Sequence, residues 1–180
     1  PQVASRGGSH RGAGLPRVQR AGVLANLRAY AREAAARLAI DADIFERQID
    51  QESGFNPDAH NAGSGADGIA QIVPKWHPAM AGKTRDPLAS LDYAAALMAG
   101  YLKQYQGDWA LALSCYNAGS GNTANGIAGT LDGWPYAETV AYVANILNLS
   151  AAEASRRLTK GRPSVPPAVT YNPDAVVDLQ

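Results

Sequence analysis

Apolar residues recur at helical spacing along most of this chain, and no strand-like alternation competes with that pattern. A repeat at three and four residues marks the buried face of an amphipathic helix. The pattern predicts helices at residues 23–38, 41–52, 69–73, 86–107, 108–119, 135–148 and 150–161. The expected fold class is therefore mostly α.

Capping residues fall where this pattern begins and ends. Asp41 and Asp86-Pro87 are typical helix starts, since an acidic N-cap binds free amide groups and proline suits the first turn. Ser150 with Glu153 forms a capping box before the last predicted helix. The polar, glycine-rich segment 56–66 carries too many helix and strand breakers, and we expect no regular structure there.

The two ends of the chain lack an apolar pattern. Residues 1–20 are rich in Gly, Ser and Arg and predict a basic, flexible arm, while residues 162–180 contain four prolines and predict a tail or linker. Residues 21–161 are then one folded domain, which is what 180 residues lead us to expect.

Composition excludes several classes of protein. Lys+Arg and Asp+Glu both number 16, so no overall field favours nucleic acid, and no window is apolar enough to span a membrane. The only cysteine, Cys115, allows no disulfide and is interpreted as a buried, inert thiol. His10, His60 and His77 lack metal-ligand spacing, and we expect no metal and no cofactor.

One acidic residue lies on the apolar face of a predicted helix, where a charge is unfavourable. Glu52 falls on the same helical stripe as Phe45 and Ile49, the face that turns toward the core. Burial disfavours a carboxylate and raises its pKa, as a general acid near neutral pH requires. From this helix alone, a structural acid that pairs or caps inside the fold is an equally good interpretation.

Four short segments change that balance. In order, they are Glu52-Ser53-Gly54-Phe55-Asn56-Pro57, Gly65-Ala66-Asp67-Gly68-Ile69-Ala70-Gln71, Cys115-Tyr116-Asn117-Ala118-Gly119 and Glu138-Thr139-Val140-Ala141-Tyr142-Val143. Together they resemble the lytic transglycosylase family, which has a goose-lysozyme-like fold. The resemblance covers about residues 40–149, and four motifs in the same order are far more specific than one.

The resemblance implies a substrate, a reaction and a set of residues. The substrate would be the peptidoglycan glycan strand, cleaved between N-acetylmuramic acid and N-acetylglucosamine to leave a 1,6-anhydromuramic acid end. Glu52 matches the single catalytic acid of the family. The other matched positions are substrate-binding Ser53, Gly68, Gln71, Tyr116 and Asn117, and site-supporting Glu138 and Tyr142. Gly68 would let the backbone approach the sugar.

The sequence also departs from the family pattern. Ala70 stands where the family has methionine, which would remove one apolar contact to the sugar and widen the site. The usual loop serine is displaced, and Asn61 or Ser64 could replace it. Among the tryptophans, Trp134 is the best candidate for a platform on which a sugar stacks.

Two other functions remain open. A lysozyme-like or chitinase-like hydrolase on the same fold would need a second carboxylate, for which Asp67 is the only candidate near the motif. A structural virion or envelope protein with a vestigial enzyme domain is the third hypothesis. A bacteriophage particle, as a tail or internal protein, or the bacterial envelope or periplasm is the expected setting. The two ends of the chain would be available to contact virion or envelope proteins.

Overall fold

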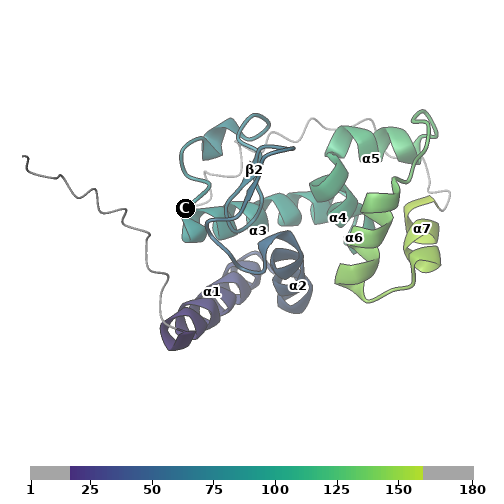
Figure 1. Ribbon diagram of the computed structural model, residues 1–180. Helices are drawn as coiled ribbons and strands as arrows, with labels where there is room; N and C mark the ends of the chain where they lie inside the picture. Colours follow the sequence, from purple (N-terminus) through teal and green to yellow (C-terminus); the bar gives the residue numbers. More distant parts are fainter. Residues whose placement is uncertain (1–16, 160–180) are drawn as a thin grey trace, which may run out of the picture.

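The computed structural model describes residues 17–159, with side chains from residue 22 onward. Helices account for most of this part of the chain, as predicted (Figure 1). The elements are α1 (Arg17–Arg37), α2 (Ala42–Ser53), β1 (His60–Asn61), β2 (Ala66–Asp67), the 3₁₀ turn η1 (Pro78–Met80), α3 (Pro87–Gln104), α4 (Trp109–Ala118), α5 (Ser120–Ile127), α6 (Ala137–Leu147) and α7 (Ala151–Thr159).

The first helix begins before the predicted start of the domain at residue 21. Helix α1 begins at Arg17, inside the segment predicted as an arm. Residues 1–16 and 160–180 lie outside the described residues, so the rest of the arm, the end of the last helix at Gly161 and the tail stay predictions.

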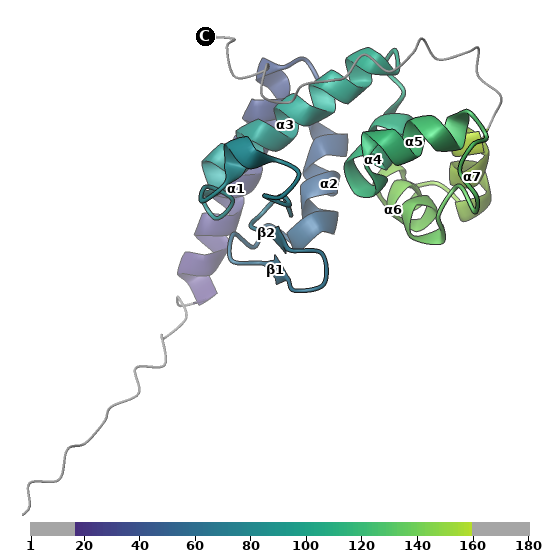
Figure 2. The ribbon, with the colours of Figure 1, turned by 90° about the horizontal axis from the view of Figure 1, so that it is seen from above.

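The helices form two groups joined by α3 (Figures 1 and 2). Helices α1 and α2 pack on each other and lie on the same side as the short β1–β2 hairpin, while α4, α5, α6 and α7 gather on the other side. Helix α3 contacts both α1 and α4, and α2 reaches across to α6. The end of α2 therefore lies where the two groups meet.

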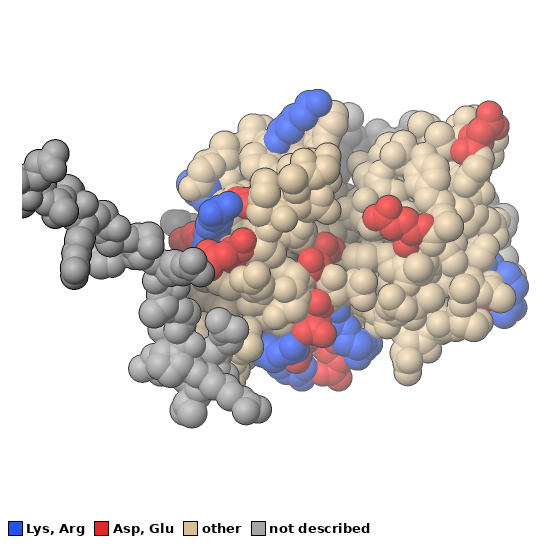
Figure 3. All heavy atoms as spheres, viewed as in Figure 1, with Lys and Arg blue, Asp and Glu red and all other residues tan. Residues whose placement is uncertain are grey.

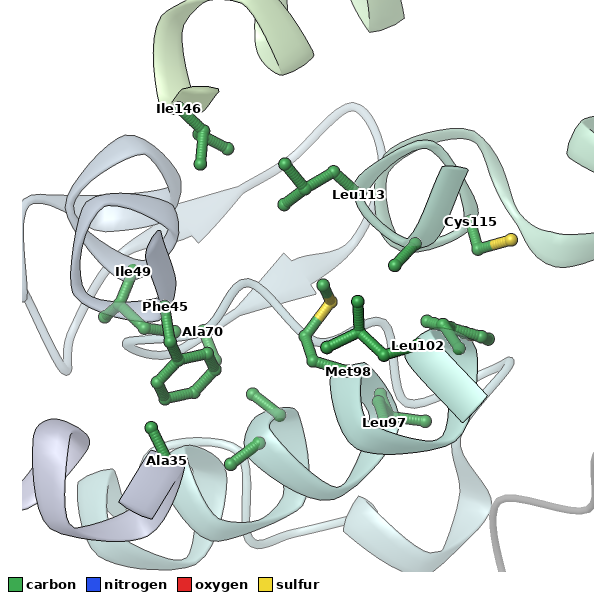
Figure 4. Close-up of a cluster of buried hydrophobic side chains, with 14 of the residues drawn as sticks. Ala35, Phe45, Ile49, Ala70, Leu97, Met98, Leu102, Leu113, Cys115 and Ile146 are labelled. Carbon is green, nitrogen blue, oxygen red and sulfur yellow. The ribbon is translucent and has the colours of Figure 1, made fainter. Parts of the chain in front are cut away.

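One hydrophobic core runs through both groups. Phe45 and Ile49 of α2 are fully buried, and Figure 4 shows them near Met98 of α3 and Ile146 of α6. Leu113 of α4 lies in the same cluster. Because α2 contributes its apolar face to this cluster, the direction in which its last turn points is set by the core.

Charged residues fix the opposite face of α2. Arg28 of α1 forms ion pairs with Glu46 and Asp50 and stands 4.3 Å above the ring of Phe55, while Arg32 binds Glu46 at 2.9 Å. In Figure 3 one group of blue and red side chains lies together at the lower edge of the molecule, and other charged side chains are spread over the left, the top and the right of that view. Exposed pairs stabilise little one by one, but a shared network holds α1 and α2 in register.

The predicted helix starts at Asp41 and Ser150 are confirmed, and a glycine ends α2. The Asp41 carboxylate accepts hydrogen bonds from the backbone amides of Asp43 and Ile44, at 2.9 and 3.0 Å. Gly54 ends α2 in the left-handed conformation with φ 61°, which glycine adopts at little cost. The Ser150 hydroxyl accepts from the Glu153 amide at 3.2 Å and starts α7.

The predicted helix at residues 69–73 is wrong. Asp67 and Ile72 exchange two backbone hydrogen bonds of 3.0 and 3.2 Å, and the four residues between them form a tight loop. A helix of five residues is too short to be stable alone, so a pairing that satisfies the same backbone groups prevails. The segment 56–66, predicted to be irregular, contributes strand β1 and the first residue of β2.

Two further differences concern helices. Helix α5 was not predicted, because Ser120–Ile127 contains two glycines and buries only Thr123. The Thr123 hydroxyl hydrogen-bonds the Ser114 hydroxyl at 2.8 Å. Packing on α4 therefore stabilises a helix whose residues have low intrinsic helix propensity. Leu88 lies at helical spacing with the buried residues of α3 but is 44% exposed, since the first turn of that helix extends past the core.

Candidate active site

Glu52 lies in the last turn of α2, partly exposed, on the side that faces α6. The Tyr142 hydroxyl donates a hydrogen bond to Glu52 Oε1. This contact joins residues 90 positions apart, so it depends on the packing of α2 against α6. The prediction that Tyr142 supports the acid is consistent with this contact.

The surroundings of Glu52 hold its proton unusually tightly. Burial raises the pKa of Glu52 from 4.5 to about 7, and the hydrogen bond from Tyr142 opposes part of that rise. Among the side chains of residues 22–159, no lysine or arginine forms an ion pair with this carboxyl. Near neutral pH the group is divided between its acid and base forms, and it can both give and take a proton.

Tyr116 approaches the acid from α4. Its hydroxyl donates to the backbone oxygen of Ala70 at 2.7 Å, and burial, with the nearby Glu52 charge, raises its pKa well above 10. Burial likewise raises the pKa of Tyr142. Both tyrosines therefore stay neutral donors through the pH range in which Glu52 titrates.

The loop at residues 68–71 is fixed to the end of α2. The Ser53 hydroxyl donates to the Ile69 oxygen at 2.6 Å, and the Gln71 side-chain amide donates to the oxygens of Gly68 and Ala59 at 3.0 and 3.3 Å. Ser53 is thus occupied inside the protein and anchors the loop. Among the described residues, no hydrogen bond to the side-chain oxygen of Gln71 is seen.

Gly68 and Ala70 both lie inside the protein. Gly68 is buried, and a Cβ atom there would stand 1.7 Å from the Thr84 oxygen, so packing against Thr84 is enough to require a glycine at this position. Ala70 is fully buried. Contact of Gly68 with a sugar, and a wider site at Ala70, stay predictions.

Asn117 and Glu138 meet beside the two tyrosines. The Thr139 hydroxyl donates to Asn117 Oδ1 at 2.7 Å, and Asn117 Nδ2 donates to Glu138 Oε1 at 3.5 Å. Glu138 is exposed and bonds Asn117 rather than Glu52. The supporting role expected of Glu138 would therefore act through Asn117, whereas Tyr142 hydrogen-bonds Glu52 directly.

A cavity of about 750 Å³ opens next to this group, within the size range of small-molecule sites. Gln71, Tyr116 and Asn117 belong to its lining, and no Asp, Glu, Lys or Arg does. Glu52 itself is not part of the lining. Ser64 is part of the lining and Asn61 is not, because the Asn61 oxygen binds the amides of Gly63 and Ser64. Of the two candidates for the displaced loop serine, Ser64 has the suitable position.

Sequence reasoning chose a different tryptophan from the one at the cavity. Trp76 lines it and is 67% exposed, with Lys75 Nζ 4.7 Å from its ring. Trp134 is half-buried, edge-on to Tyr136, and packs against Gly126, where a Cβ atom would meet its indole at 2.3 Å. Spacing could not separate the two, since only the fold brings Trp76 to the cavity.

Asp67 is bound by neighbouring side chains, and Cys115 is buried. Asp67 binds Arg85, Thr84 and His60, and Arg85 above all lowers its pKa. Cys115 is buried as predicted, and burial raises its pKa to about 11, which keeps the thiol protonated.

Along residues 17–159, no helix is both long and apolar enough to cross a membrane.

Comparison with protein-family models adds an independent finding. Residues 29–133 match the model of the transglycosylase SLT domain. The match contains Glu52, the 68–71 loop, Tyr116 and the lining of the cavity, and it ends before α6.

Proposed function

Because the chain belongs to the transglycosylase SLT domain family, we propose that it cleaves peptidoglycan glycan strands with Glu52 as the only acid and base. The bond broken is that between N-acetylmuramic acid and N-acetylglucosamine. The product is a 1,6-anhydromuramic acid end. The observation that carries this proposal is a single partly accessible carboxyl whose pKa is raised to about 7 and whose charge acts on Tyr116, a residue that lines a cavity without charged side chains.

The reaction uses one carboxyl twice, first as an acid and then as a base. Protonated Glu52 gives its proton to the bridging oxygen as the bond from that oxygen to C1 of the muramic acid breaks, and positive charge builds on the ring. The ionised Glu52 then takes the proton of the C6 hydroxyl while that oxygen bonds C1. Glu52 ends as it began, and no water is consumed. A pKa near the working pH serves both steps.

The other nearby carboxylates support a one-carboxylate mechanism over hydrolysis. A hydrolase needs a second carboxylate, free to act as a base for water or as a nucleophile. Asp67 is held by Arg85 and Thr84, with its pKa lowered, and Glu138 is exposed and bonded to Asn117. With neither placed as that second group, the hydroxyl of the substrate itself is the better nucleophile, since binding holds it near C1.

The lining of the cavity suits an uncharged N-acetyl sugar. The lining contains the amide and hydroxyl groups of Gln71, Asn117, Ser64 and Asn122 together with apolar side chains. An acetamido group needs one donor and one acceptor, which an asparagine or glutamine supplies. The exposed indole of Trp76 offers an apolar surface for one face of a sugar ring.

The test is the chemistry of the products. Intact peptidoglycan is digested with the protein, and the soluble fragments are analysed by mass spectrometry. Anhydro ends are expected, and ends heavier by one water would establish hydrolysis instead. Glu52→Gln should abolish release of fragments, since an amide cannot transfer the proton. Asp50→Asn, which removes an exposed carboxylate from the same helix, is the matched control and should stay active.

The proposed setting follows from the substrate. Peptidoglycan lies in the bacterial envelope, so the protein must act there, either as a resident of the envelope or periplasm or as part of a bacteriophage particle that opens the wall. Detection of the protein in purified particles or in the envelope fraction of cells would decide between the two.

A further inference from the structure

Gln48 is the one fully buried amide side chain of α2. It precedes Glu52 by four residues, so the two side chains stack on the same face of the helix. Neither Oε1 nor Nε2 of Gln48 makes a hydrogen bond of normal geometry with a protein group. Such a group destabilises the folded state, whereas an apolar side chain of the same shape would not.

The polar group on which the Gln48 amide acts is the hydroxyl of Tyr142, the residue that hydrogen-bonds Glu52. The Gln48 amide lies close enough to lower the pKa of Tyr142, although short of full hydrogen-bond geometry. Tyr142 gives its hydrogen to Glu52 Oε1, so its oxygen still has lone pairs with which to accept. A small rotation of the Gln48 amide would complete a chain from Gln48 through Tyr142 to Glu52.

We propose that Gln48 is a positioning residue for the acid: its Nε2 donates to the Tyr142 oxygen and keeps the hydroxyl hydrogen directed at Glu52 Oε1. A hydroxyl hydrogen otherwise rotates freely about its C–O bond. With Oε1 occupied as an acceptor, the proton that Glu52 delivers is confined to Oε2. The coupling of the three groups is a property of the fold, and its role in catalysis rests on the proposed function.

The direction of the effect follows from the two states of Glu52. Donation by Gln48 polarises the Tyr142 hydroxyl, which then binds ionised Glu52 more strongly than protonated Glu52. Gln48 therefore favours the carboxylate, and its loss should raise the pKa of Glu52. The other titratable group that acts on this site is Tyr116 of α4, which stays neutral beside Tyr93 and Tyr101 of α3.

Replacement of Gln48 by methionine keeps the shape of the side chain and removes the donor. In the full chain we expect Gln48→Met to raise the midpoint at which the Glu52 carboxyl titrates by carbon-13 NMR. The basic limb of the pH profile of glycan cleavage should move upward with it. Cleavage should slow about two- to ten-fold, the usual worth of one hydrogen bond, while the melting temperature is unchanged or higher. In a Tyr142→Phe background the same substitution should shift nothing further.

Ile49→Val is the matched control, because it alters packing at the next position of the same helix. It should lower the melting temperature and leave the Glu52 midpoint unmoved. An unchanged midpoint in Gln48→Met, or an equal shift in the Tyr142→Phe background, would overturn the proposal.

A second measurement needs no Gln48 variant. In the wild-type protein the side-chain amide resonances of Gln48 should follow the titration of Glu52, and they should stop doing so in Tyr142→Phe. Gln48 amide resonances that do not change as Glu52 titrates in the wild type would also overturn the proposal. Neither NMR result depends on catalysis, so failure of the proposed reaction, seen as an absence of anhydro ends from the wild type, is a separate outcome.

Discussion

The raised pKa of Glu52 predicts that this residue destabilises the protein at neutral and higher pH. In the unfolded chain Glu52 titrates near 4.5, and in the folded protein at about 7. Between these values the folded state binds a proton that the unfolded state has released. The contribution of Glu52 to stability is therefore most favourable below pH 4.5, and it is lost as the pH rises to 7.

The size of this loss follows from the same two values. A difference of 7 minus 4.5 is 2.5 pKa units, and at 1.36 kcal/mol for each unit it amounts to about 3 kcal/mol at most. Glutamine keeps the shape of the side chain and cannot ionise. Relative to the wild type, Glu52→Gln should therefore gain about 2–3 kcal/mol in free energy of unfolding between pH 4 and pH 8.

Urea unfolding of both proteins at intervals across that range is the assay. Comparing the two proteins at each pH cancels the titration of every other group that the substitution does not touch. Near pH 8 the variant should also melt several degrees higher, since 1 kcal/mol corresponds to roughly 2–8 °C in proteins near this size. Asp50→Asn, the exposed control, should show no such pH-dependent gain. A stability difference that stays constant from pH 4 to pH 8 would refute the reasoning, because it would mean that Glu52 titrates alike in both states.

Three further substitutions test the surroundings of the acid. Asp67→Asn should keep most of the glycan-cleaving activity but lower the melting temperature, because it weakens the hydrogen bonds to Arg85 and Thr84. Loss of activity at an unchanged melting temperature would favour the hydrolase hypothesis instead. Trp76→Ala should weaken binding of glycan fragments by about 1 kcal/mol or more, measured by calorimetry, at an unchanged melting temperature, and unchanged binding would remove Trp76 from the site. Gly68→Ala should destabilise the protein by about 3 kcal/mol or more in urea unfolding, because its Cβ would lie 1.7 Å from a backbone oxygen at a φ of 78°; a loss below 1 kcal/mol would show that the loop can move away.

The sequence was sufficient for features that depend on local patterns. The ends of α2 and α3 follow from Asp41, Gly54 and Asp86, because capping is a contact between near neighbours. The position of Glu52 on an apolar stripe likewise needed only the helical period. Its raised pKa was expected on the same ground.

What the sequence did not reveal depends on contacts between distant segments. The 68–71 loop replaced a predicted helix because Asp67 pairs with Ile72, and α5 exists because Thr123 finds Ser114 on α4. The choice of Trp76 over Trp134 needed the position of the cavity. The sequence shows Gln48 at helical spacing with Phe45 and Glu52. Only the packing of α6 against α2 shows that its amide is buried without a hydrogen-bond partner.

The pairing of Glu52 with Tyr142 sets a lower limit on the length of an active fragment. The family match ends at residue 133, and α6, which carries Tyr142, begins at Ala137. A fragment cut at the edge of the match would keep the acid, the loop and the cavity lining. It would lose the hydroxyl that binds the acid and leave one side of α2 without its covering helix. An active catalytic unit must therefore extend at least through Leu147, and deletion series from the C-terminal side should lose activity in one step when they enter α6.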